Sequence, residues 1–201
     1  MASAFRPTPL ALTVLALLHY EPLHPYGLQR LIRQWGKDAV INVEQRASLY
    51  RTIERLETAG LIRVRETGRD QQYPERTVYE LTDAGRTTAR TWLGDMLATP
   101  KNEYPEFPAA LSHLLLFSAE DIAQSLEARA GVLAEKLAAL EKGIAAQAAA
   151  GLPRIAGLED EYLRAVLRAE LDWVRATAAE MRDGRLSWDA DELRAFATRQ
   201  G

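Results

Sequence analysis

The sequence predicts a mainly α-helical chain of two domains with a single β-hairpin. Across the 201 residues, apolar side chains recur with helical spacing almost everywhere, and they alternate with a period of two only within residues 61–81. The first 94 residues carry 13 Lys+Arg against 10 Asp+Glu, whereas the remainder carries 12 against 18. Two prolines lie within residues 101–108, just after this change of charge. We therefore expect one domain over residues 8–98 and a second over residues 106–185.

Two helices are predicted within the first 36 residues. Thr8 is a favourable N-cap residue and Pro9 suits the first helical position, so the apolar run behind them indicates a helix over residues 9–20. A second helix also begins at a proline and ends near Gly36. The first helix is apolar nearly all round and is expected in the core, whereas the second is amphipathic.

The third predicted helix, residues 43–59, has one apolar and one polar face. Asn42 and Gln45 approximate a capping box at its start, and Gly60 follows its end in a position typical of a C-terminal glycine. The apolar stripe consists of Leu49, Ile53 and Leu56. This face is expected to pack on the core, which leaves the polar face free for another partner.

A β-hairpin is predicted between this helix and the next. Apolar and polar side chains alternate over residues 62–66, and a second β-favouring run surrounds Tyr79. Residues 67–76 between these runs are rich in charges and turn formers, so the hairpin has a long basic tip. Thr82 then caps a fourth helix, which ends at the Thr-Pro pair of residues 99–100.

The second half of the chain predicts long helices. Residues 101–108 are expected to form a linker, and residues 109–117 a short apolar helix. Ser118 opens a capping box and a long helix whose apolar positions advance by threes and fours. A Gly-Leu-Pro break at residues 151–153 precedes a last helix over residues 158–184. The two long helices can form an antiparallel hairpin, and the apolar positions left over on them predict a homodimer.

The order of the predicted elements, three helices, a hairpin and a helix, is that of a winged helix-turn-helix domain. The third helix is then the recognition helix, and its polar face carries arginines beside the small residues Ala47 and Ser48. Arginine binds guanine bidentately or contacts phosphate, and small residues let a helix approach base edges. Arginines and glutamines of the hairpin would add phosphate and minor-groove contacts. The candidate DNA-binding residues are Tyr26, Gln45, Ser48, Tyr50, Arg51, Arg55, Arg65, Arg69, Gln71, Gln72 and Arg76.

The chain resembles the PadR-like family of transcriptional regulators in the segments HPYGLQRLI at 24–32, LYRTIERLETAGLI at 49–62 and YELTDAG at 79–85. Their order and spacing are similar to the family pattern over residues 10–98, although Arg46-Ala47-Ser48 departs from the small or turn-forming residue that members commonly carry there. The resemblance implies a homodimeric repressor that binds double-stranded DNA through a winged helix-turn-helix domain. It also implies a helical C-terminal dimerisation domain of the longer subgroup and, in many members, a response to a small hydrophobic effector. By the same resemblance, Tyr50 contacts the DNA backbone.

Several of these interpretations have alternatives. Tyr50 can pack against the hairpin rather than touch DNA. Tyr26 can stabilise the turn before the second helix rather than donate to a phosphate at the positive end of that helix. Trp92 and Trp173 can stack an aromatic effector between subunits, or they can be core or interface residues.

Composition and motifs argue against several other functions. The chain has no cysteine, which excludes disulfides and thiolate metal sites, and it has no two-histidine metal spacing, glycine-rich phosphate loop or nucleophile triad. We therefore expect no enzymatic activity, no cofactor and no metal. No apolar run reaches the length of a membrane helix and no secretory leader is recognisable, so we expect a cytoplasmic protein that does not bind membranes. The competing function is a winged-helix module that binds a partner protein rather than DNA.

Overall fold

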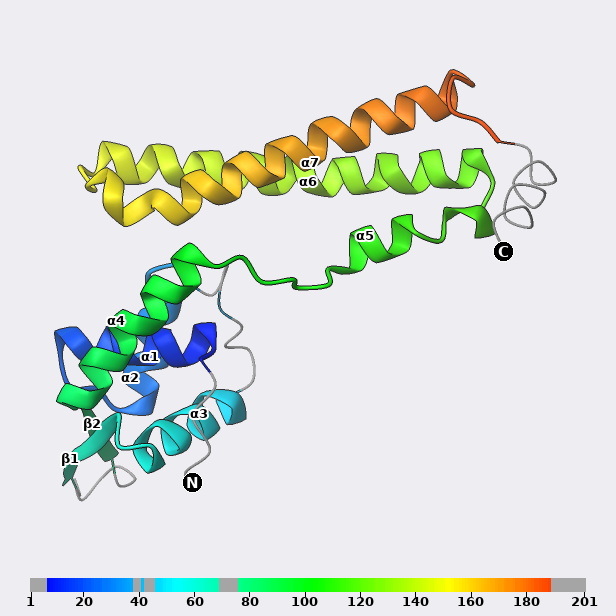
Figure 1. The fold of residues 1–201 in the computed structure, drawn as a ribbon. Helices are drawn as coiled ribbons and strands as arrows, with labels where there is room; N and C mark the ends of the chain where they lie inside the picture. Colours follow the sequence, from blue (N-terminus) through cyan, green and yellow to red (C-terminus); the bar gives the residue numbers. More distant parts are fainter. Residues whose placement is uncertain (1–6, 38–40, 42–45, 69–75, 189–201) are drawn as a thin grey trace, which may run out of the picture. The chain divides into compact units, whose positions relative to one another are not determined.

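The computed structural model describes residues 7–37, 41, 46–68 and 76–188. The chain divides into two compact units, Met1–Asn102 and Glu103–Gly201. The first unit contains α1 to α4 and a two-stranded antiparallel sheet, and the second contains α5, α6 and α7 (Figure 1). The protein is therefore mainly helical with one described hairpin, as the sequence predicts.

Helices α1 (Pro9–Tyr20) and α2 (Pro25–Gln34) begin where the sequence predicts. The Thr8 hydroxyl accepts a hydrogen bond from the backbone N–H three residues later at 3.1 Å, which caps α1. His24 Nδ1 accepts the equivalent bond in α2 at 2.7 Å. The core of this unit draws on all of its elements, and its large members include Leu15, Leu28, Ile32, Leu49, Ile53, Leu56, Ile62 and Trp92.

The third helix, α3, is described over Arg46–Thr58 and packs its apolar stripe into this core. Leu49, Ile53 and Leu56 are each no more than 2% exposed. The predicted capping box at residues 42–45 lies outside the described residues. Gly60 has φ 69°, a left-handed conformation that favours glycine, which confirms the predicted end of the helix.

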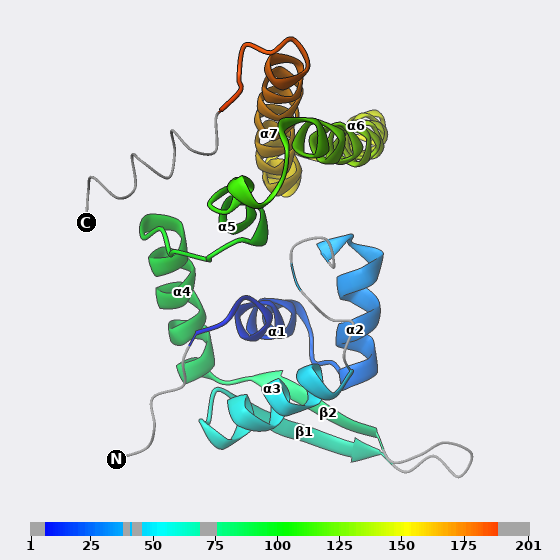
Figure 2. The same cartoon turned by 90° about the vertical axis from the view of Figure 1, so that its right-hand side faces the viewer.

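Strands β1 (Ile62–Gly68) and β2 (Arg76–Leu81) form the antiparallel hairpin beside α3 (Figure 2). The two residues that flank Arg65 pair with adjacent residues of β2, so Arg65 is the extra residue of a β-bulge. The strict alternation expected over residues 62–66 is therefore wrong at this point. Leu23 adds an isolated bridge to the sheet, because it exchanges two backbone hydrogen bonds of 3.0 Å with Tyr79.

A closely packed joint links β2 to α4 (Asp83–Ala98). Thr82 caps α4, since its hydroxyl oxygen accepts from the N–H of Gly85 at 3.0 Å, and the same hydroxyl donates to the carbonyl of Gly60 at 2.8 Å. Gly85 is buried, and a Cβ atom there would lie 2.9 Å from the carbonyl carbon of Leu61 and closer still to its oxygen. The joint therefore has no room for a side chain at this position.

The second unit begins with α5 (Glu106–Leu111), which a short 3-10 turn, η2 (Leu114–Leu116), follows. The prediction of a linker as far as Pro108 and of one helix over residues 109–117 is wrong at both ends. Pro105 is the N-cap residue, and Pro108 lies in the first turn, where a backbone N–H has no intrahelical partner to lose. The helix can therefore start before Pro108.

Helices α6 (Ala119–Ala149) and α7 (Leu158–Arg182) form the long hairpin, and η3 (Arg154–Gly157) lies between them (Figure 1). Residues early in α6 pair with residues late in α7, so the two helices are antiparallel, as predicted. The pairs are Glu127 with Arg182, Arg129 with Glu170, and Glu141 with Arg168. The core between the helices includes Ile122, Leu126, Leu133, Leu137, Leu171, Val174 and Met181.

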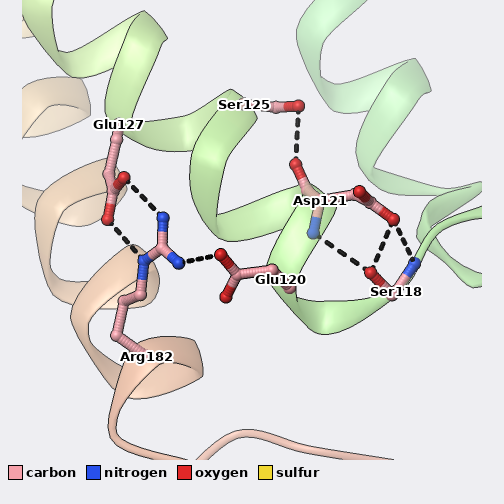
Figure 3. A network of polar contacts seen from close by, with 6 residues as sticks. All are labelled: Ser118, Glu120, Asp121, Ser125, Glu127 and Arg182. Carbon is pink, nitrogen blue, oxygen red and sulfur yellow. Dashed lines mark hydrogen bonds and ion pairs between the residues drawn. The ribbon is translucent and has the colours of Figure 1, made fainter.

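A polar network ties the two helices together at the open end of the hairpin (Figure 3). The Ser118 hydroxyl accepts from the N–H of Asp121 at 3.1 Å, and the Asp121 carboxylate accepts from the N–H of Ser118 at 3.3 Å, which confirms the capping box. The Ser118 hydroxyl also donates to the Asp121 carboxylate at 2.5 Å, and this bond, together with that from the Ser118 N–H, holds the pKa of Asp121 below its ordinary value. Arg182 donates to both oxygens of Glu127 at 2.8 Å and also pairs with Glu120, and its hydrogen bonds lower the pKa of Glu127.

Candidate nucleic-acid interface

The face of α3 opposite its buried stripe is open to solvent. A helix makes one turn in about 3.6 residues, so the residues two positions from each buried one fall on this open side. Its exposed members are Ala47, Arg51, Glu54 and Arg55, and the half-buried Ser48 lies at its edge. One face is therefore held by the core, while the other presents two arginines and two small side chains, with Glu54 at the edge toward the hairpin.

Arg51 is placed on the N-terminal half of this face by a bond to its own helix. Its Nε donates to the carbonyl oxygen of Ala47 at 3.2 Å, so the side chain runs back toward the start of α3. Recognition helices contact base edges mainly through their N-terminal residues, and the terminal nitrogens of a guanidinium can bind guanine bidentately. The position of Arg51 suits such a contact.

The flank of α3 nearest the hairpin is acidic. Burial raises the pKa of Tyr79 on β2, and the negative charges of Glu57 and Glu54 raise it further. The two carboxylates therefore lie close to the hairpin, where they would repel a phosphate. Reasoning from sequence missed this flank, although the spacing of Glu54 and Glu57 places them one turn apart on the same side of the helix. The N-terminal half of α3 is therefore more favourable for an anionic partner than the flank beside the hairpin.

Tyr50 lies at the edge between these regions. It is 55% exposed, and it is close enough to Tyr79 to contribute to the raised pKa of that residue. The ring therefore borders the hairpin while more than half of its surface is open. The contact with the DNA backbone that the resemblance implies stays a prediction.

The arginines of the hairpin differ in their surroundings. Arg63 donates from Nε to Glu80 across the strands at 2.6 Å, so this cation has a carboxylate partner. Arg65 is exposed, and the β-bulge turns its side chain out of the regular alternation. The backbone of Arg76 pairs with Gly68, whereas the Arg76 side chain lies outside what the structure describes. Four further candidates also lie outside the described residues: Gln45, Arg69, Gln71 and Gln72.

Tyr26 stands at the start of α2 and is 64% exposed. Its ring stacks against that of His24, with 6.0 Å between centroids and 26° between planes. Because His24 Nδ1 accepts the capping bond, the neutral ring carries its proton on Nε2. His24 thus stabilises the turn, while Tyr26 keeps an open position at the positive end of the helix.

The two tryptophans proposed for an effector have different environments. Trp92 is 8% exposed and belongs to the core of the first unit, which favours the core interpretation for this residue. Trp173 is 47% exposed on α7, and its ring meets that of Phe107 edge-to-face at 6.1 Å. Of the two, Trp173 is the one with an open surface.

Within the described ranges, no group of three or more His, Asp or Glu side chains is placed to hold a metal ion. None of the helices described is both long enough and apolar enough to span a membrane.

The first unit, with its core-anchored α3, its hairpin and its capped α4, is a winged helix-turn-helix domain. Residues 14–91 match the sequence model of the transcriptional regulator PadR-like family. The resemblance found in the sequence is confirmed. The family consists of transcriptional regulators, not of enzymes. A comparison with curated protein sequences finds no match.

Solved structures share this fold over most of the chain. PadR from Bacillus subtilis in complex with operator DNA is 17% identical with a TM-score of 0.71, and the alignment covers 87% of this chain and 99% of that one. The same protein in complex with p-coumaric acid gives 16% identity, a TM-score of 0.70, and coverage of 86% and 98%. The Vibrio cholerae virulence activator AphA gives 21% identity, a TM-score of 0.67, and coverage of 87% and 98%. At this level of identity the similarity establishes the fold.

Proposed function

We propose that the protein is a transcriptional regulator that binds double-stranded DNA as a homodimer, with residues 8–98 as the DNA-binding domain and residues 106–185 as the dimerisation domain. The observation that carries the proposal is the open face of α3, where Arg51 and Arg55 are exposed opposite a stripe fixed in the core. The family match over residues 14–91 supports it independently.

In this proposal the N-terminal half of α3 enters the major groove. Arg51 reads a base edge, and small neighbours allow the close approach. Arg65 on the hairpin and Tyr26 at the start of α2 contact phosphates on either side. The complex of Bacillus subtilis PadR with operator DNA supports this use of the shared fold.

Dimerisation is proposed for the second unit because its hairpin leaves large apolar side chains exposed. These include Val132, Tyr162, Val166 and Trp173. A second copy related by two-fold symmetry would cover them and would place two recognition helices about 34 Å apart, one turn of DNA. The expected operator is therefore an inverted repeat.

We propose that the protein represses transcription from the promoters it binds and that it responds to a small hydrophobic effector. The family resemblance favours repression, whereas AphA is named as an activator, so a reporter fused to a bound promoter is needed to decide the sign. The complex of Bacillus subtilis PadR with p-coumaric acid supports an effector.

The test is a selection of bound genomic fragments by the purified full-length protein, followed by titration of the best fragment at several salt concentrations. A DNA-binding protein loses affinity steeply as salt rises, because phosphate contacts release counterions. Arg51→Gln should weaken binding to the selected site. Arg90→Gln, which changes an exposed arginine of α4, is the matched control and should leave it unchanged.

The competing function, a module that binds a partner protein, predicts a different result. No fragment would be enriched, and any binding of duplexes would be equally weak for all sequences. Either outcome would overturn the proposed function.

A further inference from the structure

A pocket lies within the second unit, between the α5–η2 segment and the first half of α6. Its volume is about 420 Å³, and sites for small molecules commonly measure about 300–1,000 Å³. The lining is almost entirely apolar and includes Phe107, Leu111, Leu114, Phe117, Ile122 and Leu126. A ligand for this pocket must therefore be mainly apolar.

Arg129 is the charged member of the described lining. Its Nε donates to Glu170 at 2.7 Å, and its guanidinium lies over the ring of Phe107 with 3.7 Å between Cζ and the ring centroid. These two contacts fix the orientation of the group at the pocket wall. A guanidinium has five N–H donors and no acceptor, and Glu170 accepts from two of its nitrogens. A ligand atom that meets Arg129 must therefore be a hydrogen-bond acceptor.

Ser125 gives the pocket a second polar point. Its hydroxyl donates to the backbone carbonyl of Asp121 at 2.8 Å, so its proton is engaged within α6. The hydroxyl adds no strong donor for a ligand. His113 also lines the pocket, and an imidazole can donate or accept, so Arg129 is the lining group that can only donate and that requires an acceptor on the ligand.

We propose that this pocket binds a small, mainly apolar molecule that carries one hydrogen-bond acceptor, a carbonyl or carboxylate oxygen. Arg129 donates a hydrogen bond to this oxygen. The site is separate from the open surface of Trp173, although Phe107 touches both. One wall of the pocket is α5, which follows directly on the segment that joins the two units. A bound ligand would hold α5 against α6, and its effect on DNA affinity rests on the proposed function.

The side chains at the rim allow a rival occupant. Leu116 and Phe117 are both more than half exposed, so a second copy of the chain could insert a side chain here instead. The volume and the presence of a few polar groups, Arg129 among them, in a mainly apolar lining favour the small molecule.

The test is calorimetric titration of the full-length protein with 2-acetylnaphthalene and 2-ethylnaphthalene, which differ in the carbonyl oxygen. A hydrogen bond to a charged donor should make the ketone bind about tenfold more tightly. Arg129→Met should remove this preference while 2-ethylnaphthalene still binds. Arg168→Met removes an arginine of a comparable ion pair with Glu141 outside the pocket, and should leave the preference intact.

A second variant fills the pocket. Ala110 lines it, so Ala110→Trp should abolish binding of both probes, whereas Ala139→Trp on an exposed position of α6 should not. The proposal is overturned if neither probe binds the natural sequence, if Arg129→Met keeps the preference, or if Ala110→Trp binds the probes normally and instead changes the sedimentation of the protein. Titration of DNA is measured separately. Loss of probe binding alone contradicts this site, and loss of DNA binding alone contradicts the proposed function.

Discussion

Replacing Gly85 with alanine tests the packing of the joint between the hairpin and α4. The new Cβ atom would overlap the carbonyl group of Leu61, a backbone group that no change of rotamer can move aside. Either the start of α4 or the backbone of Leu61, between α3 and β1, must shift. Since the N–H of Gly85 also donates to Thr82, the shift would strain the cap of α4 as well.

The magnitude follows from two opposing effects. Overpacking of a rigid core costs about 1–3 kcal/mol, and a clash with backbone belongs at the upper end of this range. Alanine is favoured over glycine within a helix by up to about 1 kcal/mol, which offsets part of the cost. The net loss for Gly85→Ala is about 2 kcal/mol, and each kcal/mol lowers the melting temperature of a unit of this size by roughly 4–8 °C.

Gly94 provides the matched control in the same helix, because a Cβ atom there meets nothing within 4 Å. Gly94→Ala should stabilise the protein by about 0.5–1 kcal/mol. Thermal unfolding of the full-length chain can be followed by tryptophan fluorescence, with Trp173 and Trp188 changed to phenylalanine so that the signal comes from the first unit. If Gly85→Ala melts at the same temperature as Gly94→Ala or above it, the packing argument is wrong.

Three further predictions concern the interface, the joint and the hairpin. Arg51→Ala should weaken binding to the cognate duplex by about 1–3 kcal/mol and should reduce the preference for one base pair at a single position of the site. Arg65→Ala should weaken binding to all duplexes alike and should lower the slope of log affinity against log salt concentration by about one. If Arg51→Ala loses equal affinity for cognate and scrambled duplexes, Arg51 does not read a base. Thr82→Val should lower the free energy of unfolding, measured in urea, by about 1–2 kcal/mol because the cap of α4 is lost. Thr82→Ser keeps the capping hydroxyl and should retain most of the stability of the natural sequence. Arg182 lowers the pKa of Glu127 in the folded state, so this pair stabilises the protein above the ordinary pKa of glutamate and the contribution is lost as the pH falls through the lowered value. Arg182→Gln should therefore make the melting temperature of the second unit depend less steeply on pH between about 6 and 3. If the melting temperatures of the variant and of the natural sequence change with pH in the same way, this reasoning is wrong.

The starts of the helices could be predicted from sequence because a cap acts within a single turn. Thr8, Thr82 and Ser118 each bond to a backbone N–H three residues ahead, so the relevant atoms are adjacent in the chain. The bulge at Arg65 could not be predicted in this way, because it depends on which residues of β2 lie opposite. The requirement for Gly85 likewise depends on a carbonyl group that is 24 residues away in the chain.

In the candidate interface, too, local features could be predicted from the sequence, and features that depend on distant residues could not. Helical periodicity alone places Arg51 and Arg55 opposite the buried stripe, so their exposure could be predicted. The acidic flank arises only when Glu54 and Glu57 approach Tyr79 on a strand that follows α3 by more than 15 residues. The pocket beside Arg129 also requires the chain to turn back on itself after α5, and no local pattern indicates such a return.

The bonds of Thr82 have a consequence for how the wing can vary. They close the base of the hairpin, because the backbone N–H of Thr82 donates to the carbonyl of Leu61 at 3.2 Å just where β1 begins and β2 has ended. The recognition helix and α4 are therefore joined to each other at this base, independently of the residues at the far tip. Under the proposed function, insertions, deletions and substitutions in the tip would change its contacts with DNA without moving α3. If the protein binds DNA as proposed, the tip of the hairpin can be exchanged between relatives while the core and α3 keep their packing, and such grafts are expected to alter operator preference.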